Sequence, residues 1–170
     1  MKSHKDFPRC PIVDTGPLFD FLIWEYAKHF TKLSLLSSTS CIKNETEWKA
    51  IQWYFGYAKP IFTSPGVIAE ITGLLKSRMK FSDIEIGSFW LFAKQPLIQL
   101  GLDEELIKFK DMEVHLIQQF FPTDTSLIKI AQQHQLHIFT ADGKLSSFCR
   151  KNNISVLEIH DIVTFQQESI

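Results

Sequence analysis

The stretch Pro11-Ile12-Val13-Asp14-Thr15-Gly16-Pro17-Leu18 joins a short apolar run to a carboxylate, a turn and a second apolar segment. Ile12 and Val13 indicate a buried strand. Pro17 suits the first turn of a helix, because the amide hydrogen that it lacks would have no partner there. Asp14 would then lie at the carboxyl end of the strand. Ligands bind at that edge in open α/β sheets, so Asp14 is the first candidate site residue.

The composition is that of an ordinary globular domain. The chain has 170 residues, of which 45% are apolar and 22% charged, and its 15 Phe and four Trp favour an aromatic core. The net charge is −1 and the isoelectric point about 6.6. No overall basic field predicts nucleic-acid binding. Any polyanion would have to be held by a local basic patch or by metal ions.

The cysteine pattern and the lack of targeting segments favour a cytoplasmic protein. Cys10, Cys41 and Cys149 are an odd set without a CxxC pair, which is typical of reduced thiols. Residues 1–10 contain no apolar core of a signal peptide. No apolar run approaches the roughly 18 residues that a membrane span needs, so a membrane partner is not expected.

Apolar periodicity and turn residues predict short strands alternating with helices. Strands are expected at residues 11–14, 61–63, 97–100, 137–140 and 154–157. Helices are expected over residues 17–30, 45–58, 82–94, 103–120 and 144–152, with others starting at Ser64-Pro65 and Thr123-Asp124 and a closing helix capped by Asp161. A polar loop is expected at 37–46. In the helix over 103–120, five side chains are expected to face inward: Leu106, Phe109, Val114, Ile117 and Phe120.

This alternation predicts an α/β protein with three layers, α/β/α, around a short, mostly parallel twisted sheet. No repeat, low-complexity tract or linker divides the chain. We therefore expect a single domain over residues 1–170.

Four acids are expected at one edge of this sheet. Asp14 and Asp142 each end an apolar strand, and parallel strands joined by right-handed crossovers point the same way. Glu70 and Asp124 lie near the starts of helices, which begin at that edge when they follow strands. Four converging carboxylates would repel one another unless a cation lay among them. Mg²⁺ or Mn²⁺ prefers such oxygen ligands and supports phosphodiester chemistry by activating a water.

Four segments of the chain occur in a characteristic order: Ile12 to Thr15, Thr63 to Glu70, Asp124 to Ala131 and Ile138 to Asp142. With these segments the chain resembles a PIN domain, the nuclease family that includes the VapC-like toxins of toxin–antitoxin pairs. Smaller matches are Lys144-Leu145 and Asn153-Ile154, and the likeness spans residues 11–163. A helical insertion at about 31–60 separates Asp14 from Glu70 further than in compact members.

The resemblance implies a Mg²⁺- or Mn²⁺-dependent endoribonuclease that cleaves single-stranded or structured RNA. Asp14, Glu70, Asp124 and Asp142 would form the catalytic, metal-binding acidic cluster, and the Thr140 hydroxyl would orient the cluster and a water. A toxin with a cognate antitoxin is one form of this function, a housekeeping RNA-processing nuclease is the other, and the resemblance also implies a homodimer. Close to the acids, two residues are candidates for substrate binding: Lys144 and Thr15.

Each acid also has an ordinary structural interpretation. Asp14 can cap the first helix, and Asp124 can be an N-cap or a first-turn acid favoured by the helix dipole. Glu70 can lie on a solvated helix face, and Asp142 before Gly143 can be part of a turn. Their joint occurrence in the order of the family favours a shared site.

Two further features have alternative interpretations. The basic run Lys76, Arg78 and Lys80 could contact RNA phosphates, but solvated charges at a helix end are the commoner case. The aromatic residues over 48–57 could stack bases, although helical spacing favours the core or a partner interface.

A catalytically inactive PIN-like module that binds protein or RNA is the competing hypothesis. It is favoured by the aromatic insertion and the lack of a basic surface. Other α/β classes lack their motifs. A haloacid-dehalogenase-type phosphatase needs a second Asp where Gly16 stands, a response-regulator receiver needs paired acids early in the chain, and the phosphate-binding GxxxxGK and GxGxxG loops are missing.

Overall fold

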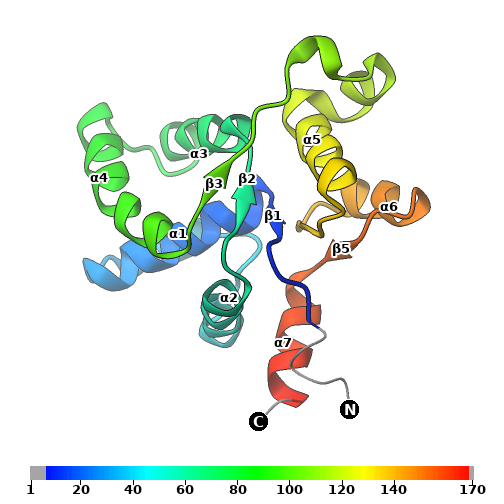
Figure 1. Cartoon of the computed structure of the whole chain (residues 1–170). Coiled ribbons are helices and arrows are strands. Elements are labelled where there is room, and N and C mark those ends of the chain that lie inside the picture. The colour runs from blue at the N-terminus through cyan, green and yellow to red at the C-terminus, as the bar shows by residue number, and fades with distance from the viewer. Residues whose placement is uncertain (1–6, 169–170) are drawn as a thin grey trace.

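The computed structural model describes residues 7–168. Residues 1–6, part of the segment on which the expected lack of a signal peptide depends, and residues 169–170 lie outside the described residues. Within 7–168, five strands form one all-parallel sheet, in the order β3-β2-β1-β4-β5 (Figure 1). The strands are β1 (Ile12–Val13), β2 (Phe62–Thr63), β3 (Asp103–Glu104), β4 (Ile138–Phe139) and β5 (Val156–Leu157). The predicted three-layer α/β/α class is confirmed.

Helices flank this sheet. In Figure 1, α1, α3 and α4 lie to the left of the strands and α5 and α6 to the right. None of the described helices is both long and apolar enough to cross a membrane. The α-helices are α1 (Thr15–His29), α2 (Glu45–Ala58), α3 (Pro65–Ser77), α4 (Asp83–Gln99), α5 (Val114–His134), α6 (Gly143–Lys151) and α7 (Ile159–Glu168), and the 3-10 turns are η2 (Leu33–Ser38) and η3 (Phe109–Asp111).

Strand β1 occupies the middle of the sheet, as its apolar residues predict. Ile12 and Val13 are fully buried. The Ile12 amide donates to the His137 carbonyl at 2.8 Å, and the Asp14 amide donates to the Phe139 carbonyl at 3.0 Å. The chain moves outward from β1 to β2 and β3, then returns to the other side of β1 as β4. The strand order therefore reverses between β1 and β4, where doubly wound sheets bind their ligands.

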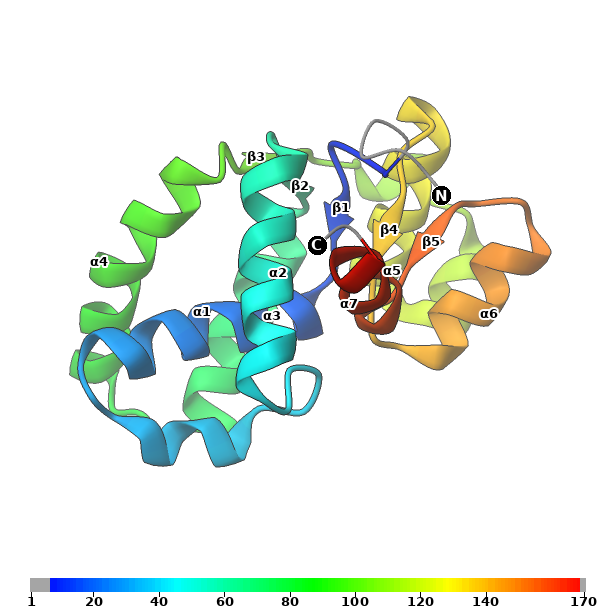
Figure 2. The same cartoon turned by 90° about the horizontal axis from the view of Figure 1, so that it is seen from below.

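The aromatic helix predicted over 45–58 forms as α2 with those bounds. Tyr54 and Phe55 are fully buried. Their rings meet Phe139 of β4 edge-on, at centroid distances of 6.0 and 5.9 Å. Helix α2 also packs beside α7 (Figure 2). These two aromatic side chains therefore form part of the core and are not a surface for stacking bases.

The prediction for residues 97–120 is wrong in three respects. Residues 97–99 are not a strand but the end of α4, which continues through Pro96. The strand that follows Gly101 is β3, a charged edge strand, and charged residues are common on edge strands because they oppose pairing with other chains. The helix begins only at Val114. Three side chains expected to face inward are exposed, namely Leu106 (71%), Phe109 (70%) and Val114 (69%).

The helix predicted to end at residue 120 and the one predicted to start at Thr123-Asp124 are the two parts of α5, separated by a kink. Phe121 has non-helical torsions, with φ 63° and ψ 171°, and a second helical segment starts at Pro122. Two smaller expectations need correction. The polar loop expected from residue 37 begins after Ser38, because η2 includes 37 and 38. Asp161 lies inside the first turn of α7, where its Oδ2 accepts from the Glu158 amide at 2.9 Å.

Candidate acidic site at the switch point

A pocket of about 350 Å³ is lined by all four predicted acids. Asp14 follows β1, and Asp142 follows β4 on the other side of the switch point. Glu70 comes from α3, and Asp124 from the segment of α5 that follows the kink. Chain segments up to 128 residues apart thus contribute carboxylates to one concave surface at the carboxyl edge of the sheet.

Asp14 is the buried member of this group, only 7% exposed. Its Oδ1 accepts from the Thr15 amide at 2.6 Å, which caps α1, and its Oδ2 accepts from the Thr140 hydroxyl at 2.6 Å. Burial raises the pKa of Asp14 above its usual range. The two hydrogen bonds act in the opposite sense, and the charges of Glu70 and Asp142 raise the pKa further.

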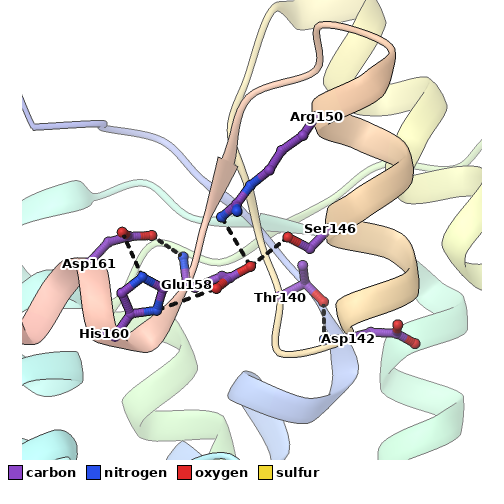
Figure 3. Close-up of polar contacts among 7 residues, drawn as sticks. All are labelled: Thr140, Asp142, Ser146, Arg150, Glu158, His160 and Asp161. Atoms are coloured by element: carbon purple, nitrogen blue, oxygen red, sulfur yellow. Dashed lines mark hydrogen bonds and ion pairs between the residues drawn. The ribbon is translucent and has the colours of Figure 1, made fainter.

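Thr140 connects Asp14 to the turn that carries Asp142. While its hydroxyl donates to Asp14, the same oxygen accepts from the Asp142 amide at 2.9 Å (Figure 3). Asp142 is exposed and caps α6, because its Oδ1 accepts from the Lys144 and Leu145 amides at 2.7 and 3.1 Å. The capping interpretation of Asp14 is therefore correct. Asp142, interpreted as part of a turn, caps α6, and both residues also line the pocket.

Thr15 bridges two acids. Its hydroxyl donates to Glu70 Oε2 at 2.6 Å while its amide donates to Asp14. Lys144, the other predicted substrate contact, does not bridge two acids in this way. Its Nζ donates to the Gln119 carbonyl at 2.6 Å and lies 5.1 Å above the Phe120 ring, and Lys144 is not among the residues that line the pocket.

Asp124 carries the clearest electrostatic signature of the site. Burial, followed by the charges of Asp14, Glu70 and Asp142, raises the pKa of Asp124 to about 7, although the Lys144 charge acts in the opposite sense. A carboxylate beside three others is expected to behave in this way. The four acids are therefore close enough to interact through their charges.

This shift predicts that Asp124→Asn stabilises the protein above pH 7. The pKa of Asp124 is about 7 in the folded state and 3.8 without the protein environment. The folded state thus holds the proton more tightly, and its stability falls as pH rises from about 4 to 7. At pH 8 we expect Asp124→Asn to raise the free energy of unfolding by on the order of 1 kcal/mol, a value reduced by solvent screening.

Urea denaturation at pH 5 and pH 8 measures this effect. At pH 5 the substitution should stabilise the protein less than at pH 8, because folded Asp124 is then still mostly protonated. Asp111→Asn is the matched control, since Asp111 is exposed and lies in η3. An equal change at both pH values would contradict the prediction.

The donor set fits a hard divalent cation. It consists of carboxylates, and burial together with mutual repulsion raises the pKa of two of them, so a cation would relieve the repulsion. Among residues 7–168, no three His, Cys, Asp or Glu side chains are already arranged as metal ligands. Mg²⁺ often uses one or two carboxylates and completes its coordination with water and substrate phosphates, so the carboxylate donors fit without a preformed cage of three.

Two residues that sequence reasoning undervalued border the pocket. Arg78, the C-cap of α3, lines it, although the basic run 76–80 was interpreted mainly as solvated charge. Cys41 also lines it. Its segment is held by Asp20 of α1, whose Oδ2 accepts from three successive amides, those of residues 40, 41 and 42, at 2.8, 2.5 and 3.0 Å. In the sequence, the one feature that could have drawn attention to Asp20 is a carboxylate placed between two apolar residues, Phe19 and Phe21.

A larger pocket of about 610 Å³ lies against α6 and α7. Two of the side chains that line it, Arg150 and His160, are paired with Glu158 beside the pocket (Figure 3). Arg150 lies 3.1 Å from Glu158 Oε1, and His160 Nδ1 lies 3.3 Å from Glu158 Oε2. The Ser146 hydroxyl also donates to Glu158, at 2.5 Å. The acidic pocket, with its unbalanced charge, is therefore the better candidate for a functional site.

Comparison with protein-family models, with curated proteins and with solved structures identifies no match for this chain. Fold and pocket together define a doubly wound parallel α/β protein with a carboxylate-lined pocket at the switch point.

Proposed function

We propose that this chain is a Mg²⁺- or Mn²⁺-dependent endoribonuclease of the PIN type that cleaves RNA. The observation that carries the proposal is the position of Asp14, Glu70, Asp124 and Asp142 around one pocket. The raised pKa values of Asp14 and Asp124 support it, because unbalanced carboxylates favour binding of a cation.

The four acids would hold the cation, each from a fixed element of the fold. When bound, a divalent cation would neutralise the acids and a substrate phosphate and lower the pKa of an attacking water. Thr140 fixes the Asp14 carboxylate through its hydroxyl, and Thr15 fixes Glu70 in the same way. The pKa of Asp124 is about 7 without a cation. A bound cation would lower it, so cation binding near neutral pH should release a proton.

The test is cleavage of a labelled single-stranded RNA by the purified protein. We expect cleavage in Mn²⁺ or Mg²⁺ and none in EDTA, and we expect Asp142→Asn to lose it while Asp111→Asn retains it. Calorimetry without RNA gives an independent readout. We expect Mn²⁺ to bind the unaltered protein more tightly than it binds the Asp142→Asn variant. Cleavage that persists in EDTA would contradict the proposal.

A catalytically inactive binding module is the competing function, favoured by the finding that residues 7–168 contain no preformed group of three metal ligands. It predicts no Mn²⁺ binding together with capture of RNA or protein. Expression of the chain alone separates a toxin, which would arrest growth, from an RNA-processing enzyme. A cognate antitoxin and a homodimer remain predictions from the resemblance.

A further inference from the structure

We propose that the rim of the acidic pocket is a subsite for one unstacked nucleotide, with Phe121 stacking its base and Arg78 contacting its phosphate. The inference deepens the proposed function and rests on it for the class of substrate, RNA. Both residues line the same pocket as the four acids. Phe121 comes from the kink in α5 and Arg78 from the C-cap of α3.

The first argument is the conformation of Phe121. Its φ of 63° and ψ of 171° lie in a region that glycine alone adopts readily. For a bulky residue such a conformation costs on the order of 1–3 kcal/mol. Burial of the ring does not offset this cost, because Phe121 is 76% exposed. A strained backbone that presents an exposed ring at a pocket is typical of a binding residue.

The second argument is the contrast with the preceding residue. Phe120 is 3% exposed and packs edge-on against Phe148 at a centroid distance of 4.8 Å. Phe121, within the described part of the chain, makes no ring–ring or cation–π contact. The kink thus separates two adjacent rings, one used by the core and one available to a ligand. Stacking of a base on such a ring is worth about 1–3 kcal/mol.

The third argument is the charge of the rim. Among the described residues that line the pocket, Arg78 is the only cationic side chain. It contacts the Ser40 hydroxyl at 3.4 Å and lies 5.6 Å above the Phe19 ring. Within residues 7–168 it forms no salt bridge to a carboxylate. Its guanidinium therefore remains available to a phosphate, the group that the surrounding acids would otherwise repel.

Together these features predict a preference for single strands. A base can lie on the Phe121 ring only when it has left its own stack, which a paired duplex resists. The recognition is by the face of the base, so we expect little dependence on which base is bound.

The test measures binding separately from cleavage. A short single-stranded RNA containing 2-aminopurine, whose fluorescence is quenched by stacking, is titrated with the full chain in Ca²⁺ and again in EDTA. We expect quenching by the unaltered protein, on the order of tenfold weaker binding with Phe121→Ala, and retention with Phe121→Trp. Phe109→Ala is the matched control, because Phe109 is 70% exposed and lies outside the pocket lining.

Two variants address strain and charge. Phe121→Gly should lose quenching without lowering the thermal midpoint, because glycine accepts the torsions that strain Phe121. Arg78→Gln should reduce the salt dependence of binding by about one phosphate contact, and Lys80→Gln should not.

The proposal is overturned if the unaltered protein does not bind in either buffer, or if Phe121→Ala and Phe109→Ala bind equally well. Quenching that depends on Phe121, without metal-dependent cleavage, would support the subsite and refute the nuclease. Metal-dependent cleavage that is unchanged by substitution of Phe121 or Arg78 would support the nuclease and refute the subsite.

Discussion

Asp14→Asn is expected to lower metal-dependent RNA cleavage by at least about 100-fold without lowering the thermal midpoint. Asn has nearly the same shape, and its carbonyl oxygen can still accept from the Thr15 amide, as Asp14 Oδ1 does. The Thr140 hydroxyl can turn to accept from the new amide group. What disappears is a buried negative charge, which the raised pKa of Asp14 shows to be unfavourable in the folded state.

Activity and stability should therefore change independently. Initial rates with saturating Mn²⁺ and thermal melts of the same preparations make the comparison, with Asp111→Asn as the control for loss of one carboxylate. A variant that lost activity only because it unfolded would melt at a lower temperature. Unchanged cleavage by well-folded Asp14→Asn would remove Asp14 from the proposed site.

Asp20→Ala is expected to lower the free energy of unfolding by about 3–5 kcal/mol, since an amide left buried without a partner costs about 1–3 kcal/mol. The Asp20 side chain is fully buried. Its Oδ2 accepts from the amides of Ser40, Cys41 and Ile42, and alanine provides no acceptor. The segment that carries Cys41 at the pocket would then lose its attachment to α1.

Asp20→Asn is the matched comparison, because it retains one oxygen acceptor and removes only the charge. Chemical denaturation at neutral pH should rank the unaltered protein as most stable, followed by Asp20→Asn and then by Asp20→Ala. Equal losses for the two variants would show that charge is the dominant contribution, and not the hydrogen bonds.

The strands that build the site were predictable because buried parallel strands have continuous apolar runs. Ile12-Val13 and Ile138-Phe139 are such runs, and each is followed at once by the polar residues that the sheet brings together. Pro65 marked a helix start for a local reason, since proline lacks the amide hydrogen that a helix interior needs. The acids could thus be assigned to one edge without knowledge of tertiary contacts.

The segment between α4 and α5 could not be predicted in this way. Pro96 is tolerated inside a helix, and the charged pair Asp103-Glu104, predicted as the start of a helix, pairs with β2. Exposed apolar residues in 106–114 resemble an inward face because periodicity does not reveal whether a neighbour exists. The unusual torsions of Phe121 likewise depend on how the two parts of α5 pack, which no local pattern encodes.

The position of Cys41 has a consequence for chemical labelling. Burial and the charge of Asp20 raise the pKa of its thiol to about 11, so at pH 8 roughly one molecule in 1,000 carries the reactive thiolate. Alkylating reagents should therefore modify Cys41 slowly. An adduct there would lie beside Gly16, where even a Cβ atom would come within 2.9 Å of the sulfur. Because Cys41 lines the carboxylate pocket, a change in this slow alkylation rate should report on access to the pocket.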